Sequence, residues 1–204
     1  MRVVVPFAAG RPKTRLADVL DAEGRASFAR VMLRDVLDAV RAADRRPEVL
    51  ATAPVDVGAP VTVDERPLTG AVNAVLAETD GPVAVVMADL ALATGRVLRE
   101  LFETDGDVVV APGRGGGTNA LVVRHDEFRV DYHGASYLDH LAVAREVGAS
   151  VAEFDSHRLS TDVDEPTDLP EVLLHGEGDS PGWLRSAGFR LAVEDGRVEV
   201  TRPE

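Results

Sequence analysis

The stretch PVAVVMADL, Pro82–Leu90, is a nearly continuous apolar run that ends in an aspartate, Asp89. An apolar run of this kind suits a strand of a parallel sheet, because such a strand is covered on both of its faces. Strand-like runs and amphipathic helical patterns alternate on either side of it, from Arg2–Phe7 to a helix that starts at or just after Pro166. This alternation predicts an α/β fold with a mainly parallel central sheet.

The bounds of the expected elements follow from hydrophobic periodicity and from turn residues. Strands are predicted at Arg2–Phe7, Glu48–Thr52, Val61–Val63, Pro82–Leu90, Asp107–Pro112, Asn119–Val123 and Ser150–Phe154. Helices are predicted at Ala22–Ala43, Thr69–Thr79, Thr94–Thr104 and Ser136–Gly148. Thr69 is expected to cap the helix that it opens, because a threonine hydroxyl accepts a hydrogen bond from a free N–H group of the first turn.

The pattern changes after about residue 175. The segment FRLAVEDGRVEV, Phe189–Val200, alternates around Asp195-Gly196, which is a strong hairpin signal. We therefore predict a single domain over residues 1–204, with a core at 1–174 and an appended helix and hairpin at 175–204. Such a hairpin can add an edge strand to a neighbouring subunit, which would make the protein a homodimer.

The composition excludes several classes of function. The formal net charge of -13 argues against nucleic-acid binding, because no basic face is left for a phosphate backbone. The chain has no cysteine, and no apolar run approaches the ~20 residues that span a bilayer, so thiolate metal sites and a membrane protein are not expected. We predict a cytoplasmic protein. An acidic chain whose only lysine is Lys13 indicates adaptation to high salt, and GC-rich codon usage is the alternative explanation.

The first loop of the chain, FAAGRPKTRL, follows a buried strand and precedes a helix. In it Gly10 allows close backbone approach, and Arg11, Lys13 and Arg15 stand within five residues. Three cations in one loop of a very acidic chain indicate an anion site, although a solvated loop is the simpler alternative. The loop is not a Walker A motif, because G-x-x-x-x-G-K-[ST] is absent.

Acidic residues provide a candidate magnesium site. Asp89 follows the most apolar strand, where a carboxylate is costly unless something positive faces it. Asp162 and Asp164 lie two apart in STDVDEPTDL and share one side of an extended segment. Mg²⁺ takes one or two carboxylates together with substrate phosphates. The alternative for Asp89 is a turn cap, and Asp168 is expected in the first turn of the following helix.

The segment APGRGGGTNALVV, Ala111–Val123, has three consecutive glycines. Backbone N–H groups of Gly115–Gly117 can approach an anion without obstruction by side chains, and Thr118 and Asn119 add polar contacts. A flexible hairpin loop is the alternative. With no cysteine and no G-x-S-x-G elbow, the chain has no motif for a catalytic nucleophile.

Five segments, in this order, resemble the motifs of the 2-phospho-L-lactate guanylyltransferase family: PFAAGRPKTRL, MADLALAT, APGRGGGTNALVV, YHGASYLDH and LSTDVDEPTDL. The resemblance covers residues 1–174 and implies a Rossmann-like, three-layer nucleotidyltransferase (GT-A-like) fold. It also implies a role in coenzyme F-420 biosynthesis. Together with the acidic composition, it points to a salt-adapted archaeal member.

The resemblance also implies roles for matching positions. The nucleotide phosphates would be held by Gly10, Lys13 and Arg15, and the base and ribose would lie near Asn73. Mg²⁺ would be held by Asp89, Asp162 and Asp164. The phosphorylated acid would contact a set of small and polar residues: Gly117, Thr118, Asn119, Gly134 and Ser136. Lys13, Arg15 and Asp89 would act in catalysis.

The reaction implied is transfer of GMP from GTP to 2-phospho-L-lactate, which gives lactyl-2-diphospho-5'-guanosine and pyrophosphate. The chain departs from the family at Ala91, where a proline is usual, and at Gly113 and Gly115, where serine and aspartate are usual. These changes leave phosphoenolpyruvate or 3-phosphoglycerate open as acceptors. A molybdenum-cofactor or sugar nucleotidyltransferase fits the glycine segment less well. A non-catalytic nucleotide-binding regulator would have no need for a carboxylate pair at the α-phosphate.

Overall fold

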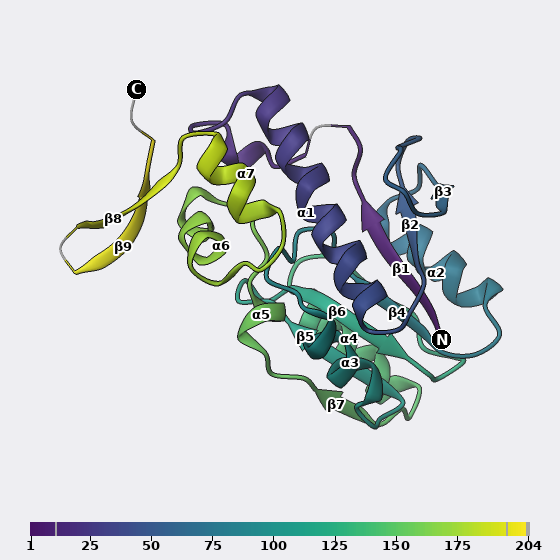
Figure 1. The fold of residues 1–204 in the computed structure, drawn as a ribbon. Coiled ribbons are helices and arrows are strands. Elements are labelled where there is room, and N and C mark those ends of the chain that lie inside the picture. Colours follow the sequence, from purple (N-terminus) through teal and green to yellow (C-terminus); the bar gives the residue numbers. More distant parts are fainter. Residues whose placement is uncertain (11, 195, 203–204) are drawn as a thin grey trace.

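The computed structural model describes residues 1–10, 12–194 and 196–202, and it is built around a seven-stranded sheet of order β3-β2-β1-β4-β6-β5-β7 (Figure 1). The strands of this sheet are β1 (Arg2–Phe7), β2 (Pro47–Ala51), β3 (Val61–Val63), β4 (Val83–Val86), β5 (Val108–Pro112), β6 (Thr118–Val123) and β7 (Val151–Glu153). A separate hairpin is formed by β8 (Arg190–Glu194) and β9 (Arg197–Thr201).

The helices connect the strands and cover the sheet. The α-helices are α1 (Ala22–Ala42), α2 (Leu68–Glu78), α3 (Gly95–Glu103), α4 (Ser136–Glu146), α5 (His157–Ser160), α6 (Leu169–His175) and α7 (Ser180–Ser186). Two short 3₁₀ helices are η1 (Thr14–Leu16) and η2 (Pro166–Asp168). No helix of the described residues is both long and apolar enough to cross a lipid bilayer.

The sheet is mainly parallel, as predicted. Strand β1 pairs in parallel with β2 and β4, β2 pairs in parallel with β3, and β5 pairs in parallel with β7. Strand β6 runs antiparallel to both β4 and β5, because a short hairpin loop joins it to β5. The chain order reverses between β1 and β4, and ligands of open α/β sheets bind at such a point, outside the carboxyl ends of the strands.

Both faces of the sheet are buried, which gives three layers. Along β1, Val3 and Val5 point into a core shared with α1 and α3, whereas Val4 points into a core shared with α2 and α4. Successive side chains of a strand point to opposite faces, so a continuous valine run needs cover on both. The α/β class predicted from the valine-rich strands is confirmed.

A third apolar cluster lies beside the sheet. It joins the first loop, the tail and the segment STDVDEPTDL (residues 160–169), which is called the acidic loop below. It contains Leu16 and Leu20 after β1, Val163 and Leu169 around the acidic residues, and Leu184 and Phe189 of the tail, with other residues. The tail also docks on α1, where Phe28 and Trp183 stack with their ring centroids 4.9 Å apart. Two loops that carry predicted site residues therefore rest on the C-terminal segment.

Some local predictions were wrong. Strand β4 ends at Val86, so Asp89 lies in the turn beyond it and not on the strand. Thr69 lies inside α2 and does not cap it: Pro67 takes the N-cap position, and the Thr69 hydroxyl accepts a hydrogen bond from the Tyr132 N–H group at 3.0 Å. The short helix α5 was not predicted, because its four residues are too few to show a period.

The hairpin predicted for the tail is confirmed by the antiparallel pairing of β8 with β9. Asp195, at its turn, lies outside the described residues. The division into a core and a tail, and the pairing of the hairpin with a second subunit, stay predictions.

The attachment of the tail can be tested at Asp35 of α1. Its carboxylate accepts hydrogen bonds from the N–H groups of Asp179 and Ser180, at 2.7 and 2.9 Å, and so caps α7 from outside. We expect Asp35→Ala to lower the free energy of unfolding by about 1–2 kcal/mol, because two N–H groups lose a charged acceptor. Urea unfolding measures the effect.

The matched control is Asp38→Ala on the same helix, where the aspartate only pairs with Arg41 at the surface. That change should cost no more than about 0.5 kcal/mol. Equal losses in the two variants would show that Asp35 does not hold the tail.

Candidate functional site

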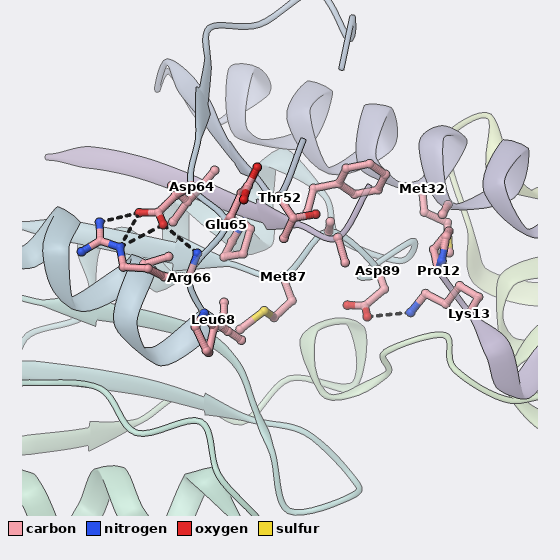
Figure 2. Close-up of a pocket in the computed structure, with 18 of the residues that line it drawn as sticks. Pro12, Lys13, Met32, Thr52, Asp64, Glu65, Arg66, Leu68, Met87 and Asp89 are labelled. Atoms are coloured by element: carbon pink, nitrogen blue, oxygen red, sulfur yellow. Dashed lines mark hydrogen bonds and ion pairs between the residues drawn. The ribbon is translucent and has the colours of Figure 1, made fainter. Parts of the chain in front are cut away.

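A cavity of about 600 Å³ opens at the carboxyl ends of β1, β2, β3 and β4 (Figure 2). Each strand contributes residues from the segment that follows it, such as Lys13 after β1, Thr52 after β2, Asp64 after β3 and Asp89 after β4. The volume lies within the range of pockets that hold small molecules. The cavity therefore occupies the place at which an α/β sheet is expected to bind its ligand.

Lys13 lies at one end of this cavity, between two carboxylates. Its Nζ is 2.7 Å from Asp89 Oδ2 and 2.7 Å from Asp164 Oδ1. The lysine side chain is only 9% exposed. Burial by itself would lower the pKa of Lys13, but attraction and hydrogen bonds from Asp89 and Asp164 outweigh it, and the net pKa is raised. The lysine is therefore a fixed cation at the bottom of the site.

The backbone of Lys13 is held in an uncommon conformation. Its φ is 54° and its ψ is 46°, in the left-handed region that costs a non-glycine residue about 1 kcal/mol. Its carbonyl accepts a hydrogen bond from the Leu16 N–H group at 3.0 Å, and the Leu16 side chain is fully buried in the third cluster. Packing of η1 thus holds the bend that turns the lysine toward the carboxylates, and such strain is common at functional sites.

The acidic loop is tied to the turn after β4 and to its own helix. The Val163 N–H group donates to the carbonyl of Asp89 at 3.2 Å. Asp168 lies at the start of the helical segment, as predicted, and its Oδ2 accepts from the N–H groups of Asp164 and Glu165 at 3.0 and 2.8 Å. Asp168 also pairs with Arg114 at 2.9 Å. These bonds fix Asp164 beside Lys13.

Asp162 accepts a hydrogen bond from Asn119 Nδ2 at 3.0 Å. Its pKa is raised, first by burial and then by the negative charges of Asp89 and Asp164, while the bond from Asn119 opposes the shift. No group of three or more His, Asp or Glu side chains among the described residues is arranged to hold a metal ion. The predicted three-carboxylate metal cage is thus not preformed, because Lys13 stands between two of its members.

The chemistry of the carboxylates nevertheless fits a hard cation. Asp89 Oδ1 is buried and has no hydrogen-bond partner among the described residues. A buried carboxylate oxygen without a donor is unfavourable, and Asp162 adds a second negative charge nearby. A divalent cation at Asp89 Oδ1 would satisfy both, since carboxylate oxygens are the ligands that Mg²⁺ prefers.

The triple glycine forms the hairpin loop between β5 and β6. The N–H groups of Gly113 and Gly116 donate to the carbonyls of Gly117 and Gly113, at 2.8 and 3.0 Å. The Arg114 N–H group donates to the carbonyl of Ser160 at 3.1 Å. Of the three predicted donors, Gly115–Gly117, only the N–H group of Gly116 is used in this way among the described residues, so anion binding by this hairpin loop stays a prediction. A Cβ on Gly113 would lie 2.6 Å from the Asn119 side chain, so the loop packs closely over that residue.

The residues predicted to contact the acid form a buried layer behind this loop. Thr118, Asn119 and Ser136 are all nearly inaccessible to solvent. Ser136 Oγ accepts from the Thr118 N–H group at 3.0 Å, and Thr118 Oγ1 lies 2.8 Å from His140 Nδ1 in a hydrogen bond. Gly134, with φ of 56°, makes the exposed turn before α4. A contact of these residues, or of Gly117, with an acid stays a prediction.

Asn73 is not among the residues that line the cavity, and its contact with a nucleotide stays a prediction. Its Nδ2 donates to the Val130 carbonyl at 2.9 Å, and its Oδ1 accepts from the Val130 N–H group at 2.8 Å. Both polar atoms of the amide thereby attach the segment 128–132 to α2 by hydrogen bonds. A sequence pattern shows only that a helix carries an asparagine. It does not show that a neighbouring backbone forms hydrogen bonds with both polar atoms of the side chain.

The remaining cations of the first loop lie further out. Arg15 is 67% exposed and reaches Asp164 at 3.4 Å. Gly10 is exposed, and Arg11 lies outside the described residues. Arg15 is thus placed at the rim of the cavity, on the same carboxylate as Lys13.

The end of the cavity away from Lys13 was missed by the sequence analysis. It is lined by Thr52, which follows β2, and by Asp64–Leu68, which follow the short edge strand β3 (Figure 2). The segment DERP resembles an ordinary solvated loop, and β3 has only three residues. The rule that ligands meet the carboxyl ends of strands was the one signal that indicated it.

Comparison with known proteins identifies the family. The family model described as "Guanylyl transferase CofC like" matches residues 1–202. The chain is 64% identical over 203 residues, covering 100% of this chain and 100% of the other, to the 2-phospho-L-lactate guanylyltransferase of Halomicrobium mukohataei. It is 65% identical over 203 residues to that of Haloferax volcanii, covering 99% of this chain and 98% of the other. The chain therefore belongs to the CofC-like guanylyl transferase family.

Solved structures share the fold. A putative nucleotide-diphospho-sugar transferase from Desulfovibrio desulfuricans matches with a TM-score of 0.70 at 15% identity, over 90% of this chain and 93% of the other. A nucleotidyl transferase from Methanothermobacter matches with a TM-score of 0.59 at 16% identity, over 91% and 99%. A Mycobacterium tuberculosis protein solved in complex with manganese matches with a TM-score of 0.54 at 18% identity, over 85% and 98%. The nucleotidyltransferase-like fold is confirmed.

The buried layer behind the glycine loop predicts a pH dependence of stability. Burial lowers the pKa of His140 from 6.5 to about 4, and the nearby Asp139 and Asp131 oppose the shift only in part. The folded pKa lies below the unfolded one, so between these values the unfolded chain binds more protons, and stability falls as the pH falls.

From about pH 7 to about pH 4.5 we expect His140 to account for a loss of about 2 kcal/mol. The measurement is the free energy of unfolding of wild type and His140→Gln across this range. The gap between the two curves should change by this amount in favour of the variant. A constant gap would mean that His140 is protonated equally in both states.

Proposed function

We propose that this chain transfers GMP from GTP to 2-phospho-L-lactate, releasing pyrophosphate, in coenzyme F-420 biosynthesis. The observation that carries the proposal is the Lys13–Asp89–Asp164 cluster at the end of a cavity of about 600 Å³, in a chain whose family is named for guanylyl transfer. Full-length relatives named 2-phospho-L-lactate guanylyltransferase support the choice of acid.

The reaction joins two phosphates. An oxygen of the acid's phosphate attacks the α-phosphorus of GTP, and the bond from that phosphorus to the oxygen bridging to the β-phosphate breaks as pyrophosphate leaves. The attacking oxygen is already ionised near neutral pH, because the second pKa of a phosphate monoester is about 6. No general base is needed, and the difficulty is to bring two polyanions together.

Lys13 and Arg15 supply positive charge for this purpose. Lys13 Nζ is the buried cation of the cavity, and Arg15 stands at the rim beside Asp164. A guanidinium can grip phosphate oxygens with two parallel hydrogen bonds, whereas an ammonium acts as a compact point charge. We assign Lys13 to the α-phosphate and Arg15 to the outer phosphates. Positive charge fixed before the reaction stabilises charge that develops during it.

Asp89 would hold Mg²⁺ through its unpartnered Oδ1, with Asp162 or Asp164 as a second ligand. Bound there, the ion would neutralise charge on the triphosphate. Burial raises the pKa of Asp162 most, the negative charges of Asp89 and Asp164 raise it further, and a cation bound nearby would oppose these shifts. Asp89 and Asp164 also keep Lys13 in place until phosphate oxygens compete for its ammonium group.

Thr118, Asn119 and Ser136, with Gly117 and Gly134, are proposed to shape the acceptor side. Their hydrogen bonds to each other and to Asp162 support this, because a shift in the acceptor layer would move a carboxylate of the metal site. Phosphoenolpyruvate and 3-phosphoglycerate remain alternative acceptors. An acidic surface and relatives from Halomicrobium and Haloferax support a cytoplasmic enzyme adapted to high salt.

The first test is pyrophosphate release at high salt with Mg²⁺ and GTP, comparing 2-phospho-L-lactate, phosphoenolpyruvate and 3-phosphoglycerate. We expect release with 2-phospho-L-lactate at a kcat/KM at least about tenfold above the other acids, since a polar site rejects acids of different shape. Preference for another acid would change the acceptor and keep the chemistry. GTP binding without release in any arm would favour the nucleotide-binding regulator.

Asp89→Asn separates catalysis from binding. The amide keeps the size of the side chain but removes the charge that holds Lys13 and the cation. We expect kcat to fall on the order of 100-fold or more, with a change of less than about threefold in the dissociation constant of GTP. Equal losses in both would contradict the assignment. Asp105→Asn, at an exposed aspartate between α3 and β5, is the matched control and should leave both unchanged.

A further inference from the structure

Each end of the cavity carries one cation and two carboxylates, and the two ends differ in how these groups are bonded. At one end Lys13 is bound between Asp89 and Asp164. At the other end, Asp64, Glu65 and Arg66 follow β3 (Figure 2). If the phosphates of a nucleotide lie at the lysine, its base extends toward this second end. The polar groups at the second end therefore decide which base fits.

Most of these polar groups are already occupied. Arg66 donates to both carboxylate oxygens of Asp64, at 2.9, 3.0 and 2.5 Å. Hydrogen bonds from Arg66 accordingly lower the pKa of Asp64. The hydroxyl of Thr52 accepts a hydrogen bond from the Ala9 N–H group at 3.0 Å. Arg66 and Asp64 thus hydrogen-bond to each other, and Thr52 binds the backbone of the first loop.

Glu65 is the exception. Its carboxylate lines the cavity and makes no hydrogen bond or ion pair with any residue that the structure describes. A glutamate carboxylate accepts hydrogen bonds and donates none. The segment that carries it is rigid on both sides, because the Asp64 N–H group extends the ladder to Ala51 at 2.9 Å and Pro67 follows Arg66. Glu65 is exposed, and it therefore presents a carboxylate with two free oxygens at the rim of the cavity.

Guanine is the base that matches such a carboxylate. Its N1–H and N2–H groups are adjacent donors that two carboxylate oxygens can accept in parallel, in the same geometry as a bidentate arginine pair. Adenine and cytosine each present an amino group beside a ring-nitrogen acceptor, and uracil presents one N–H between two carbonyls. A carboxylate would face an unpaired acceptor in each of these cases, which is unfavourable.

The walls of this part of the cavity suit a flat ring. They are formed by apolar side chains, among them Leu50, Ala71 and Met87. Apolar walls with a few placed polar groups are the usual composition of a small-molecule site. We propose that Glu65 is the residue that selects guanine, by accepting hydrogen bonds from its N1–H and N2–H groups. This inference rests on the proposed function, since it assumes that the phosphates lie at Lys13.

The test measures nucleotide binding directly, without an acceptor acid. Titration calorimetry with Mg²⁺ gives dissociation constants for GTP, inosine triphosphate and ATP, in wild type and in Glu65→Gln. In wild type we expect GTP to bind on the order of 10- to 100-fold more tightly than ATP, the range that one bidentate base contact provides. Inosine triphosphate, which lacks the 2-amino group, should lie between them.

Glu65→Gln replaces one carboxylate oxygen by an amide N–H₂ group, so that a donor of the side chain faces a donor of guanine. We expect it to weaken GTP on the order of 10-fold or more, to leave ATP unchanged or tighter, and to reduce the preference for GTP over ATP to about threefold or less. Glu103→Gln, at the exposed end of α3, is the matched control and should keep the wild-type values. Because Glu65 makes no bond within the fold, the variant should keep the wild-type melting temperature.

The possible outcomes separate the two proposals. A wild-type preference for GTP that Glu65→Gln retains would overturn the role of Glu65 and leave the proposed function in place. Equal binding of GTP and ATP by wild type would also overturn it, and pyrophosphate release would then show whether the enzyme uses either nucleotide. Absence of binding by all three nucleotides would contradict both proposals.

Discussion

The ion cluster of Lys13 with Asp89 and Asp164 is the interaction on which the site depends. It joins three segments that are far apart in the chain: the loop after β1, the turn after β4 and the acidic loop before η2. A buried lysine is unfavourable unless carboxylates surround it, and two carboxylates that share one lysine leave an oxygen of Asp89 without a donor. The cluster therefore holds the site together while it keeps affinity for further positive charge.

The fold supplies this cluster through its topology. Strands β1 and β4 are neighbours, and the chain order reverses between them, so the segments that follow these strands meet over one edge of the sheet. The third apolar cluster then fixes the loop after β1 through Leu16 and the acidic loop before η2 through Val163. Residues of the tail complete this cluster, so a segment without any recognisable site motif contributes to the geometry of the Lys13 end of the cavity.

The sequence predicted the parts of the structure that depend on local pattern. Continuous valine runs predicted buried strands, and their alternation with helices predicted the α/β class, because both follow from periodicity and burial. The motif order predicted the family, which the comparisons confirm. The sequence also indicated Lys13 and Asp89 at the carboxyl edge of the sheet, and the acidic pattern and the resemblance added Asp162 and Asp164, but as ligands of a metal ion and not as an ion cluster with the lysine.

Features that depend on tertiary contacts could not be predicted from the sequence. Asn73 was assigned to the nucleotide, but the Val130 backbone occupies both of its polar atoms. The N–H groups of Gly115–Gly117 were expected to be free, and that of Gly116 bonds within the loop. The segment around Glu65 was missed, because only the fold brings the end of a three-residue strand to the cavity.

The central claim, that the lysine end of the cavity holds the triphosphate, is tested most directly by a crystal structure with Mg²⁺ and GMPCPP, the GTP analogue with a methylene between its α- and β-phosphorus. We expect the α-phosphate within hydrogen-bond distance of Lys13 Nζ and the metal on Asp89, with the base at the opposite end of the cavity. An analogue bound outside this cavity, or with its base at Lys13 and its phosphates at the other end, would contradict the account.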